Sequence, residues 1–346
     1  MISKQNSELR TQNSELKILI VCSKNSGKIA PFISDQVEAL KYSGLECDFF
    51  TIHGKGIKGY LKQRLPLLAK IKSFQPDIIH AHYGLSGLLA NTQRRVPVVT
   101  TYHGSDINLP GVFVFSRIAM FLSAYNIFVS QKNIDKSRQK HNFALIPCGV
   151  DTSLFFPKDK QEARQYFGFS ADEKLVLFAG HFQNAVKNPE LALSAVSLIP
   201  GVRLLELKGY TRQEVALLMN AVDVCLMTSH TEGSPQFIKE AIACGCPVIS
   251  VDVGDVKELI QDIEGCSIVE RNAGAISKAL QCITDNPTRT DAKTILEAKG
   301  LTQSMVVNKI LHIYSKVLNR HTQYRFKILN IKSNALHLVT TLLWIG

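Results

Sequence analysis

The sequence has 346 residues, 45% of them hydrophobic and 20% charged, which fits a globular protein with room for two domains of ordinary size. Its eight cysteines form no CxxC pair and no Cys/His cluster with metal-binding spacing, so the sequence offers no metal motif and favours a reducing cytosol. The net charge of +11 lies almost wholly in residues 1–150, which hold 19 Lys and Arg against 9 Asp and Glu; the remainder holds 21 against 20.

The chain opens with a polar stretch. Residues 1–15 lack the apolar core of a signal peptide, and we interpret them as a disordered leader. Residues 17–22 predict the first buried strand of an α/β domain. The turn after it has a single glycine, Gly27, so the GxGxxG fingerprint of a dinucleotide site is absent. A helix over 32–42 and a strand over 46–52 are predicted next.

A basic segment follows, in which no acidic residue occurs and leucines and isoleucines interleave with the cations. Such an amphipathic surface can dock on anionic lipid or bind an anionic acceptor. It can equally belong to a helix that packs its leucines on the sheet and leaves its lysines in water. Nucleic acid is not expected as a partner, because aromatic side chains do not interleave with the cations. The cations are Lys55, Lys58, Lys62, Arg64, Lys70 and Lys72.

Two of the next predicted strands end in histidines. Residues 77–82 read DIIHAH, and residues 96–102 lead into the segment His103-Gly-Ser-Asp106. In open α/β sheets ligands gather beyond the carboxyl ends of the strands, and a neutral imidazole can donate or accept a hydrogen bond near a sugar. His103 is therefore the stronger candidate and His82 the weaker one, while Asp106 either positions the loop or faces the acceptor. Strands over 125–130 and 143–147 complete this half.

Residues 148–157, CGVDTSLFFP, form an irregular stretch that suits a hinge, so we place a domain boundary near residue 155. The predicted elements beyond it are strands over 175–179, 202–207 and 223–227 and helices over 189–198 and 213–221.

Residues 228–254, TSHTEGSPQFIKEAIACGCPVISVDVG, predict a loop, a short helix, a tight turn and a buried strand. Ser234 suits the N-cap of the helix and Pro235 its first position, while Gly245 suits a left-handed stop. Backbone N–H groups at the start of this helix favour an anion. Glu232 and Glu240 flank that position, and carboxylates accept hydrogen bonds from sugar hydroxyls. The pattern predicts a pocket for a phosphorylated sugar; an ordinary capped helix with two solvated glutamates is the alternative.

The last part of the chain predicts helices over 255–261 and 273–282, a short strand near residue 267 and an amphipathic helix over 305–318. The tail from residue 319 is basic and ends in 11 largely apolar residues, too few to span a bilayer. This end can insert at an interface, pack on the protein or be disordered.

The stretch around Glu232 and Glu240 resembles the E-x7-E donor-binding motif of family 4 retaining glycosyltransferases, and its GSP, KEA, CG-PVIS and DVGDV segments are similar as well. The resemblance implies the GT-B fold, in which two Rossmann-like parallel-sheet domains face each other across a cleft. It also implies that Glu232 contacts the donor sugar and that Glu240 binds the ribose. The backbone of Gly233, Ser234, Pro235 and Gln236 would hold sugar hydroxyls and phosphate.

Other segments resemble the same family. Lys187 is similar to the lysine that neutralises the donor diphosphate, but His181 stands where the family has an arginine, so His181 or Arg212 would have to replace it. His103 resembles the histidine beside the donor sugar. Gly27 matches the family's glycine loop only loosely. The implied domains are an acceptor-side domain over 16–155, a donor-binding domain over 156–318 and the tail over 319–346.

The resemblance implies transfer of a sugar from a nucleotide diphosphate sugar to an acceptor hydroxyl with retention, without metal or other cofactor. Cell-envelope polysaccharide or glycolipid assembly in the cytoplasm, at the inner face of the membrane, is the expected setting. A glycan or lipid-linked acceptor is the expected partner. A nucleotide-sugar epimerase on the same fold and a catalytically impaired sugar-nucleotide-binding partner are the rival hypotheses.

Overall fold

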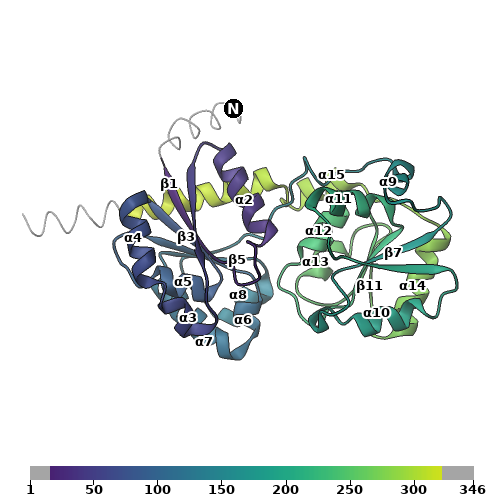
Figure 1. The fold of residues 1–346 in the computed structure, drawn as a ribbon, viewed down its shortest axis with the longest axis horizontal. Helices are drawn as coiled ribbons and strands as arrows, with labels where there is room; N and C mark the ends of the chain where they lie inside the picture. The colour runs from purple at the N-terminus through teal and green to yellow at the C-terminus, as the bar shows by residue number, and fades with distance from the viewer. Residues whose placement is uncertain (1–15, 322–346) are drawn as a thin grey trace, which may run out of the picture.

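The computed structural model describes residues 16–321, so the predicted leader and most of the predicted tail lie outside the described residues. The chain forms two α/β domains, each built on a parallel sheet, and the domains lie side by side (Figure 1). The two Rossmann-like sheets expected for the GT-B fold are thereby confirmed. Within residues 16–321, no helix combines the length and apolarity needed to cross a membrane.

The first domain is built on a six-stranded parallel sheet with the order β2-β1-β3-β4-β5-β6. Its strands are β1 (Lys17–Ser23), β2 (Glu46–Ile52), β3 (Ile78–His82), β4 (Val98–Tyr102), β5 (Tyr125–Phe128) and β6 (Phe143–Leu145). Its helices are α2 (Pro31–Tyr42), α3 (Gly56–Leu61), α4 (Arg64–Phe74), α5 (Gly84–Ala90), α6 (Ser105–Asn108), α7 (Pro110–Leu122) and α8 (Gln131–Ser137).

The alternation of side chains along β1 divides this domain into two cores. Ile18 and Ile20 point to one face, where they pack with α2 and with the helix of residues 303–321. Leu19 and Val21 point to the other face, where α3, α4 and α5 cover the sheet. The helix over 303–321, yellow in Figure 1, returns to the first domain from the far end of the chain. It buries Tyr314 in that core.

The second domain is built on a five-stranded parallel sheet with the order β11-β10-β9-β7-β8. Its strands are β7 (Lys174–Phe178), β8 (Val202–Glu206), β9 (Val224–Met227), β10 (Val248–Val251) and β11 (Ser267–Val269). Its helices are α9 (Lys160–Phe167), the 3₁₀ turn η1 (Ala185–Lys187), α10 (Pro189–Val196), α11 (Arg212–Ala221), α12 (Gln236–Ala243), α13 (Val256–Ile260), α14 (Ala273–Asp285) and α15 (Ala292–Ala298).

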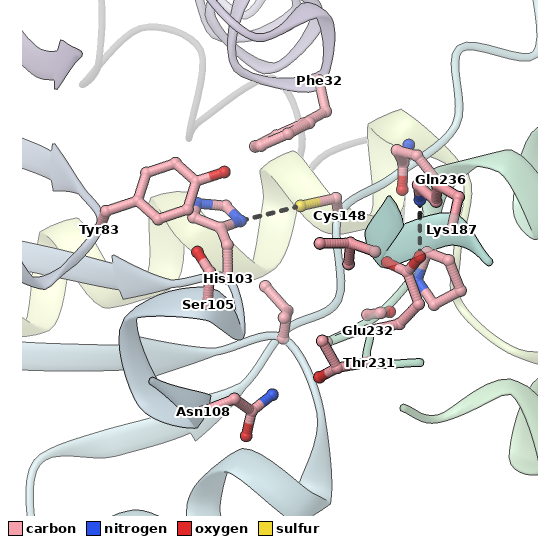
Figure 2. Close-up of a pocket in the computed structure, with 15 residues that line it drawn as sticks. Phe32, Tyr83, His103, Ser105, Asn108, Cys148, Lys187, Thr231, Glu232 and Gln236 are labelled. Carbon is pink, nitrogen blue, oxygen red and sulfur yellow. Dashed lines mark hydrogen bonds and ion pairs between the residues drawn. The ribbon is translucent and has the colours of Figure 1, made fainter. Parts of the chain in front are cut away.

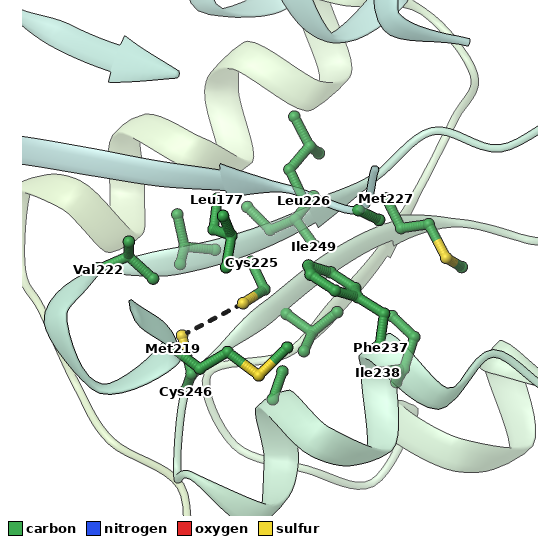
Figure 3. Packing of buried hydrophobic residues seen from close by; sticks show 14 of the residues in the cluster. Leu177, Met219, Val222, Cys225, Leu226, Met227, Phe237, Ile238, Cys246 and Ile249 are labelled. Carbon is green, nitrogen blue, oxygen red and sulfur yellow. Dashed lines mark hydrogen bonds between the residues drawn. The ribbon is translucent and has the colours of Figure 1, made fainter. Parts of the chain in front are cut away.

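The apolar face of α12 anchors the donor-type stretch to this second core. Phe237 and Ile238 lie against β9 and β10 (Figure 3), and both are buried. The left-handed stop predicted at Gly245 is confirmed by its φ of +69°. The predicted cap is wrong: Pro235 has an extended backbone and precedes the helix as its N-cap residue, so Ser234 lies one position too early to cap it.

The basic segment is not a single helix. It forms α3 and α4, with the chain turning between them at residues 62–63. Leu67 is fully buried against the sheet, whereas Leu61 and Leu65 are exposed. Lys70 pairs with Asp48 of β2. The segment therefore packs on the sheet through part of its apolar residues and leaves the rest, with most of its cations, at the surface.

Candidate active site

A cavity of about 280 Å³ lies between the two domains. The first domain lines it with Phe32, Tyr83 and His103, the segment between the domains contributes Cys148, and the second domain contributes Lys187 and the run from Thr231 to Gln236 (Figure 2). Both domains present the loops that follow their strands, because all strands of a parallel sheet end at one edge. One cavity thus brings together seven of the residues predicted from the sequence: His103, Lys187, Glu232, Gly233, Ser234, Pro235 and Gln236.

Lys187 and Glu232 form an ion pair in the second-domain wall of this cavity, with Nζ and Oε1 separated by 2.6 Å. Lys187 ends the η1 turn, which Asn184 caps, so its stem is held while its ammonium reaches the cavity. Gly180 lies behind that stem, where a Cβ atom would stand 2.9 Å from Lys187 Cγ. The pair places a cation for a phosphate directly beside a carboxylate for a hydroxyl.

The two domains touch at the loop that carries Glu232. A Cβ atom on Gly233 would stand 2.1 Å from the carbonyl oxygen of His103, and one on Gly104 would stand 2.7 Å from Gly233 Cα. Both positions therefore admit only glycine in this arrangement. The close approach brings the His103 loop and the Glu232 loop into direct backbone contact.

Helix α12 is hydrogen-bonded to the segment that joins the two domains. Gln236 Nε2 donates to the carbonyl oxygen of Gly149 at 2.6 Å, and Lys239 Nζ donates to that of Cys148 at 3.1 Å. Lys239 is fully buried, and burial lowers the pKa of its ammonium group. The helix that presents the donor-type motif is thus fixed to the segment that joins the domains.

Glu240 lies deeper in α12 and does not line the cavity. Its Oε1 accepts from Arg212 Nη1 at 2.8 Å, while Arg212 Nη2 donates to Asp35 of α2, in the other domain, at 2.6 Å. Burial raises the pKa of Glu240 to about 7, and Arg212 acts in the opposite direction. Arg212, considered above as a replacement for the missing arginine, pairs with this carboxylate and with the first domain.

The first-domain wall is formed by neutral histidines. His82 Nδ1 and His103 Nε2 are 3.0 Å apart, and the planes of the two rings lie within 21° of each other. Burial lowers the pKa of His103 to about 3 and that of His82 well below its ordinary value. His103 therefore faces the cavity as a neutral imidazole, and His82 supports it from behind.

Asp106 is 2% exposed and holds the His103 loop. Its carboxylate accepts from the backbone N–H groups of Gly84, His103 and Gly104 at 2.9 to 3.1 Å. Burial raises its pKa to about 6, against these hydrogen bonds. Of the two roles considered for Asp106, the contacts favour positioning of the loop.

Two predicted site residues are not brought to the cavity. Gly27 lies in an exposed turn after β1 with a φ of +88°, and it does not line the cavity. His181 follows β7, also off the cavity lining, and its Nδ1 is buried without a hydrogen-bond partner among residues 16–321. Ser234 Oγ does lie at the cavity, where it is buried beside the Asp255 carboxyl and acts against the burial that raises the pKa of Asp255.

Sequence reasoning missed several residues of the site. Asp35 and Tyr83 had no local motif around them, and Cys148 was noted only as the first residue of the irregular stretch 148–157. Lys239 is the first residue of the KEA segment, and only its place in that family-like segment could have identified it from the sequence. Tertiary contact alone identifies the other three.

Family models match both halves of the chain. One described as Glycosyltransferase Family 4 matches residues 37–154, and one described as Glycosyl transferases group 1 matches residues 188–286. A Bacillus subtilis protein named as the teichuronic acid biosynthesis glycosyltransferase TuaC is 26% identical over 241 residues. That match covers 61% of this chain and 62% of TuaC, so the chain spans less than two thirds of that relative.

Solved structures share the fold. The sucrose-phosphate synthase of Thermosynechococcus elongatus superposes with a TM-score of 0.69 at 18% identity, covering 91% of this chain and all of the other. The Anabaena protein Alr3699/HepE, solved in complex with UDP and glucose, gives a TM-score of 0.59 at 18% identity with the same coverage.

Proposed function

The chain belongs to glycosyltransferase family 4, and from this premise we propose that it transfers a sugar from a nucleotide diphosphate sugar to an acceptor hydroxyl with retention. One observation carries the proposal: Lys187, Glu232 and His103 converge on a single interdomain cavity. A cation, a carboxylate and a neutral imidazole in one cavity suit a ligand that has both phosphate and hydroxyl groups. HepE, which shares the fold, is solved with UDP and glucose and supports a nucleotide sugar as donor.

The proposed roles follow from the contacts. Lys187 neutralises the charge that grows on the diphosphate as the glycosidic bond breaks. Glu232, already hydrogen-bonded to Lys187, accepts from a hydroxyl of the sugar. Glu240 accepts from the ribose through the oxygen that Arg212 does not use. The Ser234 hydroxyl and the N–H groups at the start of α12 add donors for the diphosphate.

In the proposed reaction the bond from the anomeric carbon to the diphosphate oxygen breaks, and a bond to the acceptor oxygen forms on the same face of the ring. The acceptor proton passes to the departing phosphate oxygen. In this proposal Glu232 lines the cavity and orients the sugar through a hydroxyl rather than attacking the anomeric carbon. A pair of catalytic carboxylates of the glycosidase type is not required. Lys187 and the helix amides supply the charge that a metal would otherwise supply.

The proposed setting is cell-envelope polysaccharide or glycolipid assembly, which the name of TuaC supports. A cytoplasmic location with docking on the inner face of the membrane is part of the proposal. The exposed cations of α3 and α4, together with exposed Leu61 and Leu65, support such docking. Replacing Lys58, Lys62 and Arg64 with glutamate is expected to lower sedimentation with anionic vesicles, and unchanged sedimentation would reject the docking surface.

The test is a thermal-shift panel with UDP, GDP, ADP, CMP and NAD at equal concentration, because a ligand that binds only the folded state raises Tm by mass action. One nucleoside diphosphate is expected to raise Tm while NAD does not. The corresponding radiolabelled nucleotide sugar is then expected to donate its sugar to a glycan or lipid acceptor. A panel without any shift would count against the nucleotide-sugar pocket. A shift without sugar transfer would favour the impaired sugar-nucleotide-binding partner, and label that stays on the nucleotide as a new isomer would favour an epimerase.

A further inference from the structure

Four aromatic side chains form a row from the return helix to the cavity. The Tyr314 hydroxyl oxygen lies 2.6 Å from His80 Nδ1, and His80 Nε2 lies 2.7 Å from Thr101 Oγ1. The His80 and His82 rings stack with centroids 4.6 Å apart, and His82 in turn hydrogen-bonds His103. Both nitrogens of His80 are thus occupied, and neither is available to His82.

A neutral imidazole carries one proton, and its position is set by the partners of the two nitrogens. A single proton lies between His82 Nδ1 and His103 Nε2, because they are 3.0 Å apart. His82 Nε2 is buried and has no hydrogen-bond partner among residues 16–321. A proton there would leave a buried, unpaired N–H donor, which is costly. His82 therefore carries its proton on Nδ1 and donates it to His103.

We propose that His82 is a positioning residue that fixes His103 in the tautomer protonated at Nδ1, so that His103 offers an N–H donor to a hydroxyl of the bound sugar. His103 Nε2 is the acceptor of the His82 proton, which leaves only Nδ1 for the proton of His103. That nitrogen points toward Cys148 at the cavity (Figure 2). The sugar as recipient rests on the proposed function; the tautomer is a property of the free protein.

The only hydrogen-bond partner recorded for His103 Nδ1 among the described residues is Cys148 Sγ, at 3.7 Å. A thiol sulfur is a weak acceptor, so an oxygen of a sugar hydroxyl is the better partner for this N–H. The opposite assignment, in which Cys148 donates its S–H to His103 Nδ1, would force the unpaired proton onto His82 Nε2. The buried rings of this row thus determine whether His103 donates or accepts a hydrogen bond at the cavity.

The experiment is a long-range ¹H–¹⁵N correlation spectrum of the full chain with ¹⁵N-labelled histidine, without ligand. The ten histidines are assigned by single His→Gln variants. His82 and His103 are both expected to be neutral and protonated at Nδ1. Protonation of either ring at Nε2, or of both nitrogens of His103, would overturn the proposal, whatever the donor substrate is.

Three variants separate the candidate causes, and a fourth is their control. Cys148→Ala removes the sulfur and is expected to leave the His103 tautomer unchanged, whereas a switch to Nε2 would assign control to the thiol. His82→Asn retains an N–H donor and is expected to preserve the pattern, while His82→Leu is expected to give a mixture of His103 tautomers. Thr101→Val removes a hydroxyl that hydrogen-bonds His80 Nε2, and it is the matched control. A pure Nδ1 tautomer in His82→Leu would contradict the positioning role.

Turnover gives a second readout once the donor is known. His82→Leu is expected to lower sugar transfer about tenfold, the loss of one hydrogen bond of about 1.4 kcal/mol. The affinity for the nucleoside diphosphate alone is expected to stay the same, because the second domain holds it. His82→Asn is expected to recover most of the turnover. Equal losses in both variants, or a loss of nucleotide affinity, would point to a structural role instead.

Discussion

The two walls of the cavity differ in charge. The second-domain wall, called the charged wall below, holds ionic side chains, and the first-domain wall, called the neutral wall, presents an uncharged imidazole. The second-domain wall holds Lys187 paired with Glu232, and Arg212 paired with Glu240 behind it. The first-domain wall presents neutral His103, backed by His82 and by a loop tied to Asp106. When an anionic ligand binds, cations of the charged wall must leave their carboxylate partners to contact it. The side chains of the neutral wall are already held by hydrogen bonds before the ligand binds. Charge recognition and hydroxyl recognition are thus divided between the domains.

The largest effect is expected from removing the cation of the charged wall. Lys187→Ala is expected to lower sugar transfer by about 10²- to 10³-fold, the usual effect of losing one group that stabilises transition-state charge. Lys208→Ala, which removes an exposed lysine of the same domain, is the control. Initial rates at saturating donor measure both. Similar rates for the two variants would show that the diphosphate is neutralised elsewhere.

A smaller effect is expected from holding the two walls apart. Gly233→Ala places a methyl group against the His103 carbonyl, so the domains must separate or the loops must shift. Turnover is expected to fall about ten- to a hundredfold, because misplacement of about 1 Å has effects of that size. Gly111→Ala, whose methyl meets open space, is the control. Small-angle scattering should show a larger radius of gyration for Gly233→Ala alone, and wild-type turnover would mean that the contact is not needed.

The sequence predicted the charged wall better than the neutral one. Glu232, Glu240 and Gly245 lie within one short motif, where local spacing determines the geometry. The exception is Ser234, since an extended Pro235 moves the start of the helix by one residue. One of the two carboxylate partners of Arg212 is Asp35, 177 residues away, and no local pattern connects them. The His82–His103 bond likewise depends on the parallel pairing of β3 and β4, which brings two separate histidine motifs together.

The buried carboxylate of the charged wall makes stability depend on pH. The pKa of Glu240 is raised from 4.5 to about 7, so the folded state holds a proton that the unfolded chain releases. Its stabilising contribution is complete below about pH 4.5 and is lost as pH rises through 7, a change of roughly 3 kcal/mol. Glu240→Gln is expected to flatten this part of the curve. Parallel urea titrations of both proteins between pH 5 and 8 measure it; curves of the same shape would refute the assignment.

The smallest effect is expected from removing Arg212, whose ion pairs with Asp35 and Glu240 link the two domains. Arg212→Ala leaves Asp35 and Glu240 without their shared cation, and all three side chains are at most 26% exposed. A loss of about 2 kcal/mol in unfolding free energy is expected, less than for a fully buried pair because water reaches part of the site. Arg203→Ala breaks an ion pair whose arginine is 57% exposed and is expected to cost under about 1 kcal/mol.

Asp35→Asn separates the two functions of Arg212. It removes only the link to the first domain and leaves Arg212 on Glu240. If the link serves closure, Asp35→Asn should raise the radius of gyration and keep nucleotide affinity, while Arg212→Ala should change both. If Asp35→Asn changes neither, the arginine serves Glu240 alone, and the charged wall is organised without help from the neutral one. The two walls would then be coupled through the hinge contacts of Gln236 and Lys239 and the Gly233 backbone contact.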